Sequence, residues 1–390
     1  MIVKYFNHLA FTIACVLSWS CQAQPLQPLS IQTGAEQTNL YLPELEGKTV
    51  ALLVNNTSKI GETHLLDTLL ANGVQVTTIF APEHGFRGDQ SNGEKVLDGY
   101  DETTGLPIIS LYGKNTKPKD GQLDNIDVVI YDIQDVGARF YTYISSMHYM
   151  MEACAENDIQ LIILDRPNPN AHYIDGPVLE EAYASFVGMH PIPIVYGMTT
   201  GELALMILGE GWLKGADSLM LTIIPVQNWT HDTPYDLPII PSPNLPNKQA
   251  IALYPSLCLF EGTSISVGRG TSFPFQTVGY PESSFGSFTF TPISIPAASK
   301  YPKFENKVCY GYDLRQVIVP NQIDLSYLIK CYEQMPDKSK YFNAFFTNLS
   351  GTKKLRKQIE DGWTEDAIRA TWQSDLDLFK EKRKKYLLYE

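Results

Sequence analysis

The sequence has little positive charge and no sign of a repeating architecture. Its 390 residues include 43 Asp and Glu but only 30 Lys and Arg, which gives a formal net charge of −13 and a pI near 5.0. A groove for nucleic acid normally needs a basic field, so this acidity argues against a nucleic-acid partner. The absence of a Gly-X-Y period, a heptad array or a solenoid repeat excludes the fibrous and repeat classes.

Several motifs that mark common enzyme classes are also missing. No GxGxxG follows the first expected strand, which argues against a dinucleotide cofactor, and no GxxxxGK[ST] P-loop occurs. A GxSxG elbow and an HExxH motif are absent too. Beyond the N-terminal leader, Cys154, Cys258, Cys309 and Cys331 form no CxxC pair, so a structural zinc site is not expected. In an exported protein Cys309 and Cys331 could form a disulfide.

Residues 1–23 have the pattern of an export signal. Lys4 is the only charged residue, and the apolar run over residues 9–19 is too short for a membrane anchor. We favour cleavage before Gln24, while a loose lipobox offers the alternative of lipidation at Cys21. No later stretch approaches about 20 apolar residues, so we expect no transmembrane segment and a periplasmic or envelope location.

Short apolar runs alternate with helical patterns between residues 47 and 250. Continuous apolar strands that alternate with helices indicate a parallel sheet covered on both faces. We therefore predict an α/β fold, a Rossmann-like doubly wound parallel sheet. The expected strands are 50–54, 74–80, 107–111, 128–131, 161–164 and 220–226, and the expected helices are 64–71, 140–156 and 202–212.

The rest of the chain divides into a polar lead-in over residues 24–46 and a second, smaller α+β domain over residues 251–390. The boundary lies near residue 250, at the end of a Pro-rich passage (234–255) that is expected to be a connection or a cleft wall. In the second domain we expect strand-like pieces at 271–290 and 304–319, and helices at 324–334 and 365–386.

Polar residues follow four of the expected strands. Open parallel sheets bind ligands beyond the carboxyl ends of their strands, so these side chains are candidates for a binding site at one edge. The alternative for the run that begins at Asp165 is an internal turn network. The candidates are Asn55; Glu83, His84 and Arg87; Asp132, Gln134, Arg139 and Tyr141; and Asp165 and Asn168.

The run PEHGFRG is the most informative of these. Pro82 restricts the backbone before Glu83, and the glycines allow a tight turn around a ligand. A glutamate in a crevice that excludes water can act as a general acid because burial raises its pKa. The alternative is a carboxylate that stabilises the loop by pairing with Arg87.

Four further candidates lie outside these strand ends. Thr199-x-x-Glu202 matches a capping box, although Glu202 could also be catalytic. His190 is either structural or part of the site. Glu261 and Arg269 lie in glycine-punctuated segments, and Arg269 could bind a carboxylate or form a salt bridge between the domains.

Taken together, these motifs resemble the exo-β-N-acetylmuramidase family, glycoside hydrolase family 171, long known as a domain of unknown function. The resemblance runs from about residue 47 to 390. It rests on APEHGFRG (81–88), YDIQDVGARFYTY (131–143), LDRPNPN (164–170), GMTTGELA (197–204), SPNLP (242–246), LFEGTSISVGRGT (259–271) and GTKKLRKQIEDG (351–362).

This resemblance implies release of N-acetylmuramic acid from the non-reducing end of peptidoglycan glycan fragments. It places the catalytic glutamate in the PEHG motif, here Glu83, and the cleft between the two domains. It implies no metal or nucleotide cofactor. We expect Glu83 to be the general acid/base, with His84 beside it, and Arg139 or Arg269 to bind the lactyl carboxylate of the sugar.

The second catalytic group is left open. It could be Asp132, Asp135 or Glu202, or the acetamide of the substrate. Elimination to an unsaturated sugar is an alternative to hydrolysis, with Glu83, His84 or Tyr141 as acid or base. Two other classes remain: a metal-dependent hydrolase with His84, Asp132 and Asp165 as ligands, and a sugar-binding protein without catalysis.

Overall fold

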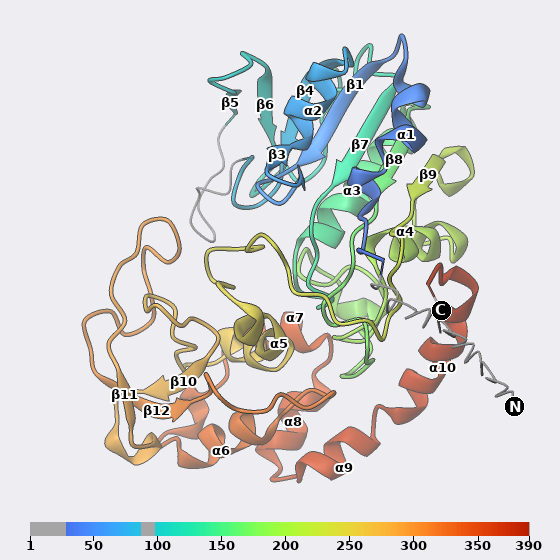
Figure 1. The fold of residues 1–390 in the computed structure, drawn as a ribbon. Helices are drawn as coiled ribbons and strands as arrows, with labels where there is room; N and C mark the ends of the chain where they lie inside the picture. Colours follow the sequence, from blue (N-terminus) through green and yellow to red (C-terminus); the bar gives the residue numbers. More distant parts are fainter. Residues whose placement is uncertain (1–28, 87–97, 390) are drawn as a thin grey trace, which may run out of the picture. The chain divides into compact units, whose positions relative to one another are not determined.

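The expected strands form one mostly parallel sheet in a computed structural model that describes residues 29–86 and 98–389. The strand order is β5-β6-β4-β1-β7-β8-β9 (Figure 1), with β5 antiparallel to its neighbour at one edge. The predicted doubly wound α/β class is confirmed. The strands are β1 (Thr49–Val54), β4 (Gln75–Ala81), β5 (Gly99–Tyr100), β6 (Pro107–Ser110), β7 (Val128–Asp132), β8 (Gln160–Leu164) and β9 (Met220–Ile224).

Alternate residues of each strand face different layers of the core. In β1, Val50 and Leu52 pack with α2 (Leu65–Ala71), whereas Ala51 and Leu53 belong to the larger cluster with α3 (Tyr143–Glu156) and α4 (Thr200–Gly209). Because side chains alternate across a strand, a run without polar residues can be buried on both faces. This arrangement explains why the strands are apolar without interruption.

The segment expected to be a polar lead-in is part of one layer. It contains η1 (Gly34–Glu36), α1 (Thr38–Tyr41) and η2 (Leu42–Leu45), and it buries Ala35, Tyr41 and Leu45 against the face that α2 covers. The Tyr41 hydroxyl donates to the Ala35 carbonyl at 2.8 Å. A small hairpin of β2 (Lys59–Ile60) and β3 (Thr63–His64) follows β1.

The second half of the chain is α+β, as predicted, with an antiparallel sheet in the order β10-β12-β11. Two expectations differ from the structure. The Pro-rich passage ends in helix α5, whose Pro255 is in the last turn, and the helix expected over 365–386 is broken at Thr371 and Trp372. The elements are β10 (Thr277–Tyr280), β11 (Phe288–Phe290), β12 (Cys309–Asp313), α5 (Lys248–Leu257), α6 (Ser326–Gln334), α7 (Phe345–Ser350), α8 (Lys354–Glu360), α9 (Glu365–Ala370) and α10 (Gln373–Arg383).

Short 3₁₀ helices complete the described residues, which from Ile31 onward form one compact unit. All four described cysteines are free, so Cys309 and Cys331 are not bridged. No helix in residues 29–86 and 98–389 is long and apolar enough to cross a membrane. The 3₁₀ helices not yet named are η3 (Glu181–Tyr183), η4 (Ala216–Ser218), η5 (Cys258–Gly262), η6 (Ser283–Phe285), η7 (Lys338–Lys340) and η8 (Lys384–Tyr386).

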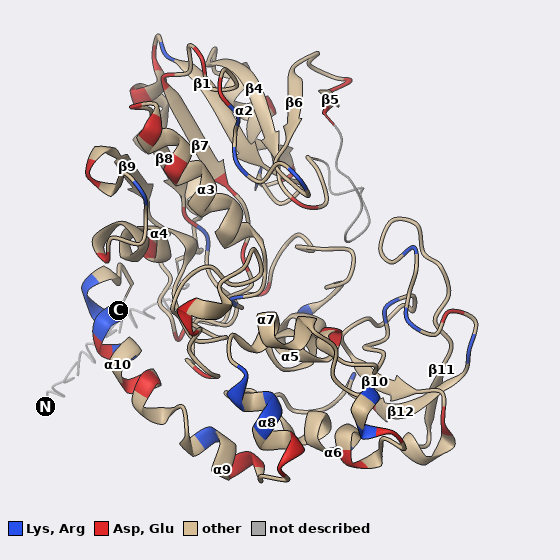
Figure 2. Ribbon diagram, turned by 180° about the vertical axis from the view of Figure 1, so that it is seen from behind, with Lys and Arg blue, Asp and Glu red and all other residues tan. Residues whose placement is uncertain are grey.

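Basic residues gather at two places in the second half, on α8 and at the end of α10 (Figure 2). The last turn of α10 carries Lys380, Lys382 and Arg383, where positive charge interacts favourably with the helix dipole. Lys382 pairs with Glu210 at 3.0 Å, and Arg383 donates to the Gly197 carbonyl. These contacts fasten α10 to the sheet half of the molecule.

Candidate active site

The PEHG motif forms a tight turn directly after β4. The Gly85 amide donates to the Pro82 carbonyl at 3.0 Å, and His84 has a φ of 70°, in the left-handed region. This third position of the turn favours glycine, so a histidine there carries a conformational cost. The turn places Glu83 and His84 at the carboxyl edge of the sheet, as predicted from the strand-end rule.

Two hydroxyl groups hold the Glu83 carboxylate. Tyr112, just after β6, donates to Oε1 at 2.8 Å, and Thr142, just before α3, donates to Oε2 at 2.8 Å. Glu83 is 9% exposed. Burial and the nearby Glu83 charge raise the pKa of Tyr112, so its hydroxyl remains a proton donor. The carboxylate is therefore fixed in position at both oxygens.

Glu83 faces a cavity of about 180 Å³ that both halves of the chain line. Aromatic rings make up much of its wall; Tyr254 and Phe275 meet edge to face with centroids 5.0 Å apart. Its sheet-half lining is Glu83, His84, Tyr112, Phe140, Tyr141, Thr142, Phe186, Val187, Ser242, Asn244 and Leu245, and its other lining is Tyr254, Cys258, Glu261, Arg269, Phe275, Phe345 and Leu349.

Glu261 and Arg269 form the charged part of the cavity wall in the second half. They pair in a bidentate geometry, with Nε–Oε1 and Nη2–Oε2 distances of 2.9 Å. Burial alone would raise the pKa of Glu261, but the charge and hydrogen bonds of Arg269, together with the charge of Lys303, keep the pKa below its usual value. Arg269 Nη1 is buried without a hydrogen-bond partner among the described residues. It is thus available to an anionic group in the cavity.

His84 and Tyr141 are held by the loop that follows Ile240. His84 Nε2 lies 3.5 Å from the Ser242 hydroxyl, and the Tyr141 hydroxyl donates to the Pro241 carbonyl at 2.8 Å. Tyr141 also meets Tyr254 edge to face, with centroids 5.8 Å apart. The loop therefore contacts two of the residues, His84 and Tyr141, that line the cavity.

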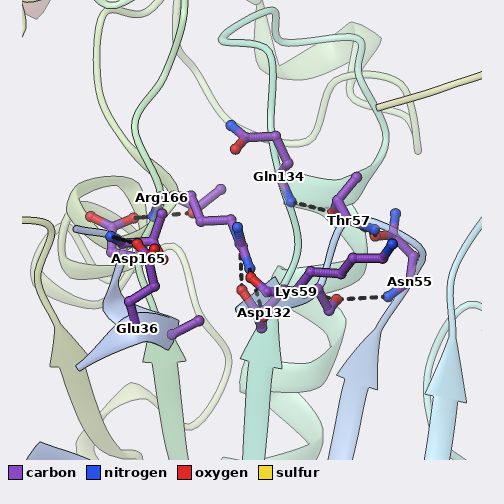
Figure 3. Close-up of polar contacts among 12 residues, drawn as sticks. Glu36, Asn55, Thr57, Lys59, Asp132, Gln134, Asp165 and Arg166 are labelled. Atoms are coloured by element: carbon purple, nitrogen blue, oxygen red, sulfur yellow. Dashed lines mark hydrogen bonds and ion pairs between the residues drawn. The ribbon is translucent and has the colours of Figure 1, made fainter. Parts of the chain in front are cut away.

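A second polar group lies at the ends of β1 and β7, where the strand order changes direction, and we call it the switch-point cluster (Figure 3). Arg166 donates to both oxygens of Asp132, at 2.5 and 2.9 Å, and to the Lys59 carbonyl at 3.1 Å. Burial opposes the charge on Arg166, yet Asp132 raises its pKa. The members are Asn55, Thr57, Asp132, Gln134 and Arg166.

Amide groups of the switch-point cluster are used internally as well. Asn55 Oδ1 accepts from the Thr57 amide and hydroxyl at 2.9 and 2.6 Å. Gln134 Nε2 donates to the carbonyls of Asp135 and Pro167, at 2.8 Å each. None of these residues lines the Glu83 cavity, which differs from the expectation of one shared site.

Asp165 and Glu202 are the acidic centre of a helix N-terminus. Asp165 accepts from the Thr199 hydroxyl at 2.6 Å, from the Gly201 amide at 2.8 Å and from the Tyr389 hydroxyl at 2.6 Å. Thr199 and Glu202 form the predicted capping box at the start of α4. Glu202 further accepts from His231 at 2.9 Å and from the Leu388 amide at 2.7 Å. Both carboxylates are thus occupied by structural contacts.

Asp135 and Asn168 tie together the loops after β7 and β8. Asp135 accepts from the Gly137 amide at 2.6 Å and from the Tyr196 hydroxyl, and burial raises its pKa to about 6. Asn168 Nδ2 donates to the Met198 carbonyl at 2.8 Å. A Cβ atom at Gly137 would lie 2.2 Å from Asn168 Oδ1, so this close approach requires glycine.

Arg139 and His190 are buried away from the cavity. Arg139 donates to the carbonyls of Pro177, Ile192 and Leu349 at 2.7–3.0 Å, and burial lowers its pKa to about 9. His190 bonds to His148 at 3.0 Å, and burial followed by the His148 charge lowers its pKa to about 3. With no exposed surface, Arg139 cannot serve as the predicted carboxylate ligand.

Five of the predicted site residues therefore line the cavity: Glu83, His84, Tyr141, Glu261 and Arg269. Arg87 lies outside the described residues, as does the leader with Cys21. Tyr112 and Thr142 were not predicted, although Tyr112 follows β6 as closely as the other candidates follow their strands. The remaining predicted residues, Asn55, Asp132, Gln134, Arg139, Asp165, Asn168, His190 and Glu202, lie in the internal networks above.

The ligand set of the metal-dependent alternative does not converge. Asp132 is paired with Arg166, Asp165 accepts from hydroxyl and amide groups, and His84 follows a different strand. Within residues 29–86 and 98–389, no three His, Cys, Asp or Glu side chains gather in a metal-binding arrangement.

Comparison with known proteins shows which family these features belong to. Family models described as Exo-beta-N-acetylmuramidase NamZ match residues 50–249 (N-terminal) and 252–389 (C-terminal). The chain is 39% identical over 386 residues to Peptidoglycan beta-N-acetylmuramidase NamZ of Bacillus subtilis (strain 168), across 92% of this chain and 91% of that protein.

Two crystal structures of DUF1343 family proteins from Bacteroides fragilis NCTC 9343 are also similar. One is 49% identical with a TM-score of 0.87, and the match covers 93% of this chain and 99% of the Bacteroides chain. The other is 31% identical with a TM-score of 0.80, and covers 92% and 99%.

Proposed function

Since the chain belongs to the NamZ family of exo-β-N-acetylmuramidases, we propose that the Glu83 cavity is the active site in which it releases terminal N-acetylmuramic acid from peptidoglycan glycans. The protein is a glycosidase that acts on peptidoglycan. One observation carries the assignment of the site. Of the two carboxylates among the described lining residues, Glu261 is paired with Arg269, whereas Glu83 has only neutral hydroxyl partners.

Glu83 is the group that moves the proton in this proposal. Glycosidases usually need a carboxyl group that exchanges a proton with the glycosidic oxygen or with water, and a second group that stabilises the anomeric carbon. Glu261 is ill suited as that second group because Arg269 occupies both of its oxygens. The acetamide of the substrate, which is part of every N-acetylmuramic acid unit, fills the role without a second free carboxylate.

Arg269 is the cation for the lactyl carboxylate. Its Nη1 has no partner in the described residues, while Glu261 fixes the other side of the guanidinium and Phe275 lies under it at 4.9 Å. A planar guanidinium held in this way binds a carboxylate with little loss of entropy. Aromatic rings such as Tyr254 offer apolar faces for the sugar ring.

Glu83→Gln tests the site assignment. With a chromogenic N-acetylmuramic acid glycoside, kcat/KM should fall by about 10²–10⁴-fold, the usual contribution of a general acid or base. Glu210→Gln is the matched control, since Glu210 bonds to Tyr386 and does not line the cavity. Comparable loss in both variants, or full activity in Glu83→Gln, would rule the site out.

Mass spectrometry of the released sugar separates hydrolysis from elimination, because an eliminated sugar lacks one water. We expect the hydrolysis product. Arg269→Met should weaken cleavage of muramic acid glycosides at least tenfold more than cleavage of the matching glycosides without the lactyl group. An equal loss on both would refute the role of Arg269.

We also propose that the enzyme works outside the cytoplasm and that its product feeds cell-wall recycling. The support is the leader-like run over residues 9–19 and the location of peptidoglycan itself. Signal cleavage predicts that Cys21→Ser leaves the protein in the soluble envelope fraction. Release of the protein from a membrane fraction by that change would instead show lipidation.

A further inference from the structure

We propose that Lys303 is a positioning residue for recognition of the lactyl carboxylate: its ammonium group holds the backbone that runs from Glu261 toward Arg269 and leaves this cavity wall with one positive charge in excess. The inference rests on the proposed function, in which Arg269 binds that carboxylate. It goes beyond that function because Lys303 lies behind the wall, outside the residues that line the cavity.

Four backbone carbonyl groups surround the Lys303 ammonium. Nζ lies 2.7 Å from the carbonyl oxygen of Thr263 and 3.2 Å from that of Ile265. The carbonyl oxygens of Phe260 and Glu261, in η5, lie at 3.1 and 3.4 Å. Because all four partners are acceptors, they suit an ammonium group, which has three N–H donors and no acceptor. The lysine therefore gathers the end of η5 and the residues after it around one cation.

The chain on both sides of these carbonyls carries the charged part of the cavity wall. Glu261 supplies one of the four carbonyls, while its carboxylate pairs with Arg269. The residue after Arg269 is Gly270. A Cβ atom there would lie 2.8 Å from Cγ of Pro302, the neighbour of Lys303, so the two segments are in close contact. The position of Lys303 is therefore coupled to both members of the charged pair.

Two cations act on the single carboxylate of this wall. Arg269 bonds to both oxygens of Glu261, and the charges of Arg269 and Lys303 both lower the pKa of that carboxyl group. Burial lowers the pKa of Lys303, and the Glu261 charge acts in the opposite direction. A partly buried excess of positive charge is unfavourable unless an anion accompanies it. The lactyl carboxylate of the sugar is an anion that restores the balance.

This excess explains how Arg269 can be paired with Glu261 and still bind an anion. An arginine whose charge is fully used in one ion pair attracts a second carboxylate weakly, because the first carboxylate repels it. Lys303 offsets part of that repulsion, and Arg269 Nη1 has no hydrogen-bond partner among the described residues. A sugar whose lactyl group is esterified would gain nothing from the excess charge.

Binding of N-acetylmuramic acid and of its lactyl methyl ester tests the inference, because the ester lacks only the charge of the acid. In isothermal titration calorimetry, the wild-type enzyme should bind the acid more tightly. Lys303→Gln removes the charge but retains an amide donor, so it should reduce this preference about tenfold. Lys303→Arg retains the charge and should keep the preference to within about threefold.

Lys307→Gln is the matched control for Lys303→Gln. Lys307 is an exposed lysine of the same segment, and its substitution should leave the preference for the acid unchanged. An equal loss of affinity for acid and ester in Lys303→Gln would show a merely structural role and would overturn the inference. Loss of the preference in folded Lys303→Arg would overturn it too, and this variant remains informative if Lys303→Gln does not fold.

Arg269→Met separates this inference from the proposed function. It should abolish the preference for the acid over the ester, because the group that contacts the carboxylate is gone. Survival of the preference in Arg269→Met would refute the carboxylate site of the proposed function, and the inference with it. Loss of the preference in Arg269→Met but not in Lys303→Gln would refute the role of Lys303 alone.

Discussion

The switch-point cluster and the Glu83 cavity lie at the same edge of one sheet, and they use similar residue types differently. In the cluster, Asp132 meets the guanidinium of Arg166 (Figure 3), and Gln134 Nε2 donates to the carbonyls of Asp135 and Pro167. In the cavity, Glu83 meets two neutral hydroxyls, and Arg269 Nη1 has no hydrogen-bond partner within residues 29–86 and 98–389. Polar groups that satisfy one another stabilise the fold, whereas groups left partly unsatisfied are available to a ligand.

Breaking the ion pair of the cluster should have the largest effect on stability. Arg166→Met leaves the buried Asp132 charge uncompensated, so the free energy of unfolding should fall by about 3–5 kcal/mol. Urea denaturation followed by fluorescence measures it. Arg315→Met, which removes an ion pair at the surface, serves as a control and should change stability far less. Equal losses of stability in the two variants would mean that the buried ion pair of the cluster contributes no more than an ion pair at the surface.

Asp135, next to the cluster, should make stability depend on pH. Burial raises its native pKa from 3.8 to about 6, so between these values the native state holds a proton that the unfolded chain releases. The contribution of Asp135 to the free energy of unfolding therefore falls as pH rises through this window. The free energy of unfolding of Asp135→Asn, measured relative to that of the wild type, should therefore increase by about 2–3 kcal/mol between about pH 4 and pH 7. Thermal or urea unfolding across that range measures the difference, and a constant difference would contradict the assignment.

Substitution of Tyr389 tests whether Asp165, at the N-terminus of α4, also has a structural role. Its hydroxyl donates to Asp165 at 2.6 Å and accepts from the Val226 amide at 2.9 Å. Tyr389→Phe should lower the free energy of unfolding by about 1–2 kcal/mol while kcat/KM of the folded enzyme is retained. Tyr386→Phe, which removes a more exposed contact with Glu210, should cost less than about 0.5 kcal/mol. A large loss of kcat/KM in Tyr389→Phe would instead place Asp165 in the active site.

Glu83→Gln should have the smallest effect on stability. Its amide oxygen still accepts one hydroxyl proton, and the other hydroxyl can rotate to accept from the amide nitrogen. The free energy of unfolding should change by less than about 0.5 kcal/mol although activity falls sharply. Urea denaturation of the same preparation used for kinetics provides the measurement. A loss above about 2 kcal/mol would mean that Glu83 is as structural as Asp132.

The sheet could be predicted because its strands are apolar on both faces. Residues 50–54 and 161–164 are apolar runs of strand length, and such runs fit a strand that is covered on both faces. Helix α5 was missed because its Pro255 belongs to the Pro-rich passage, and a proline, which has no amide hydrogen to donate, normally argues against a helix. The helix expected over 365–386 breaks at Thr371 and Trp372, and nothing in the local pattern marks this break.

The site was predictable only in part, because partner choice depends on the tertiary fold. The strand-end rule found Glu83, and applied to β6 it would also have found Tyr112. It could not separate Glu83 from Asp132, since both are acids that follow a strand closely. Arg166, which neutralises Asp132, comes from the end of another strand, so only the folded chain shows which acid is already paired.

Arg139 restricts how the two halves of the molecule can move. Its guanidinium holds the carbonyls of Pro177 and Ile192 on one side and of Leu349, a cavity residue, on the other. Opening a hinge between these segments would strand a buried cation without its acceptors. We therefore expect these segments to stay joined while the sugar enters the cavity.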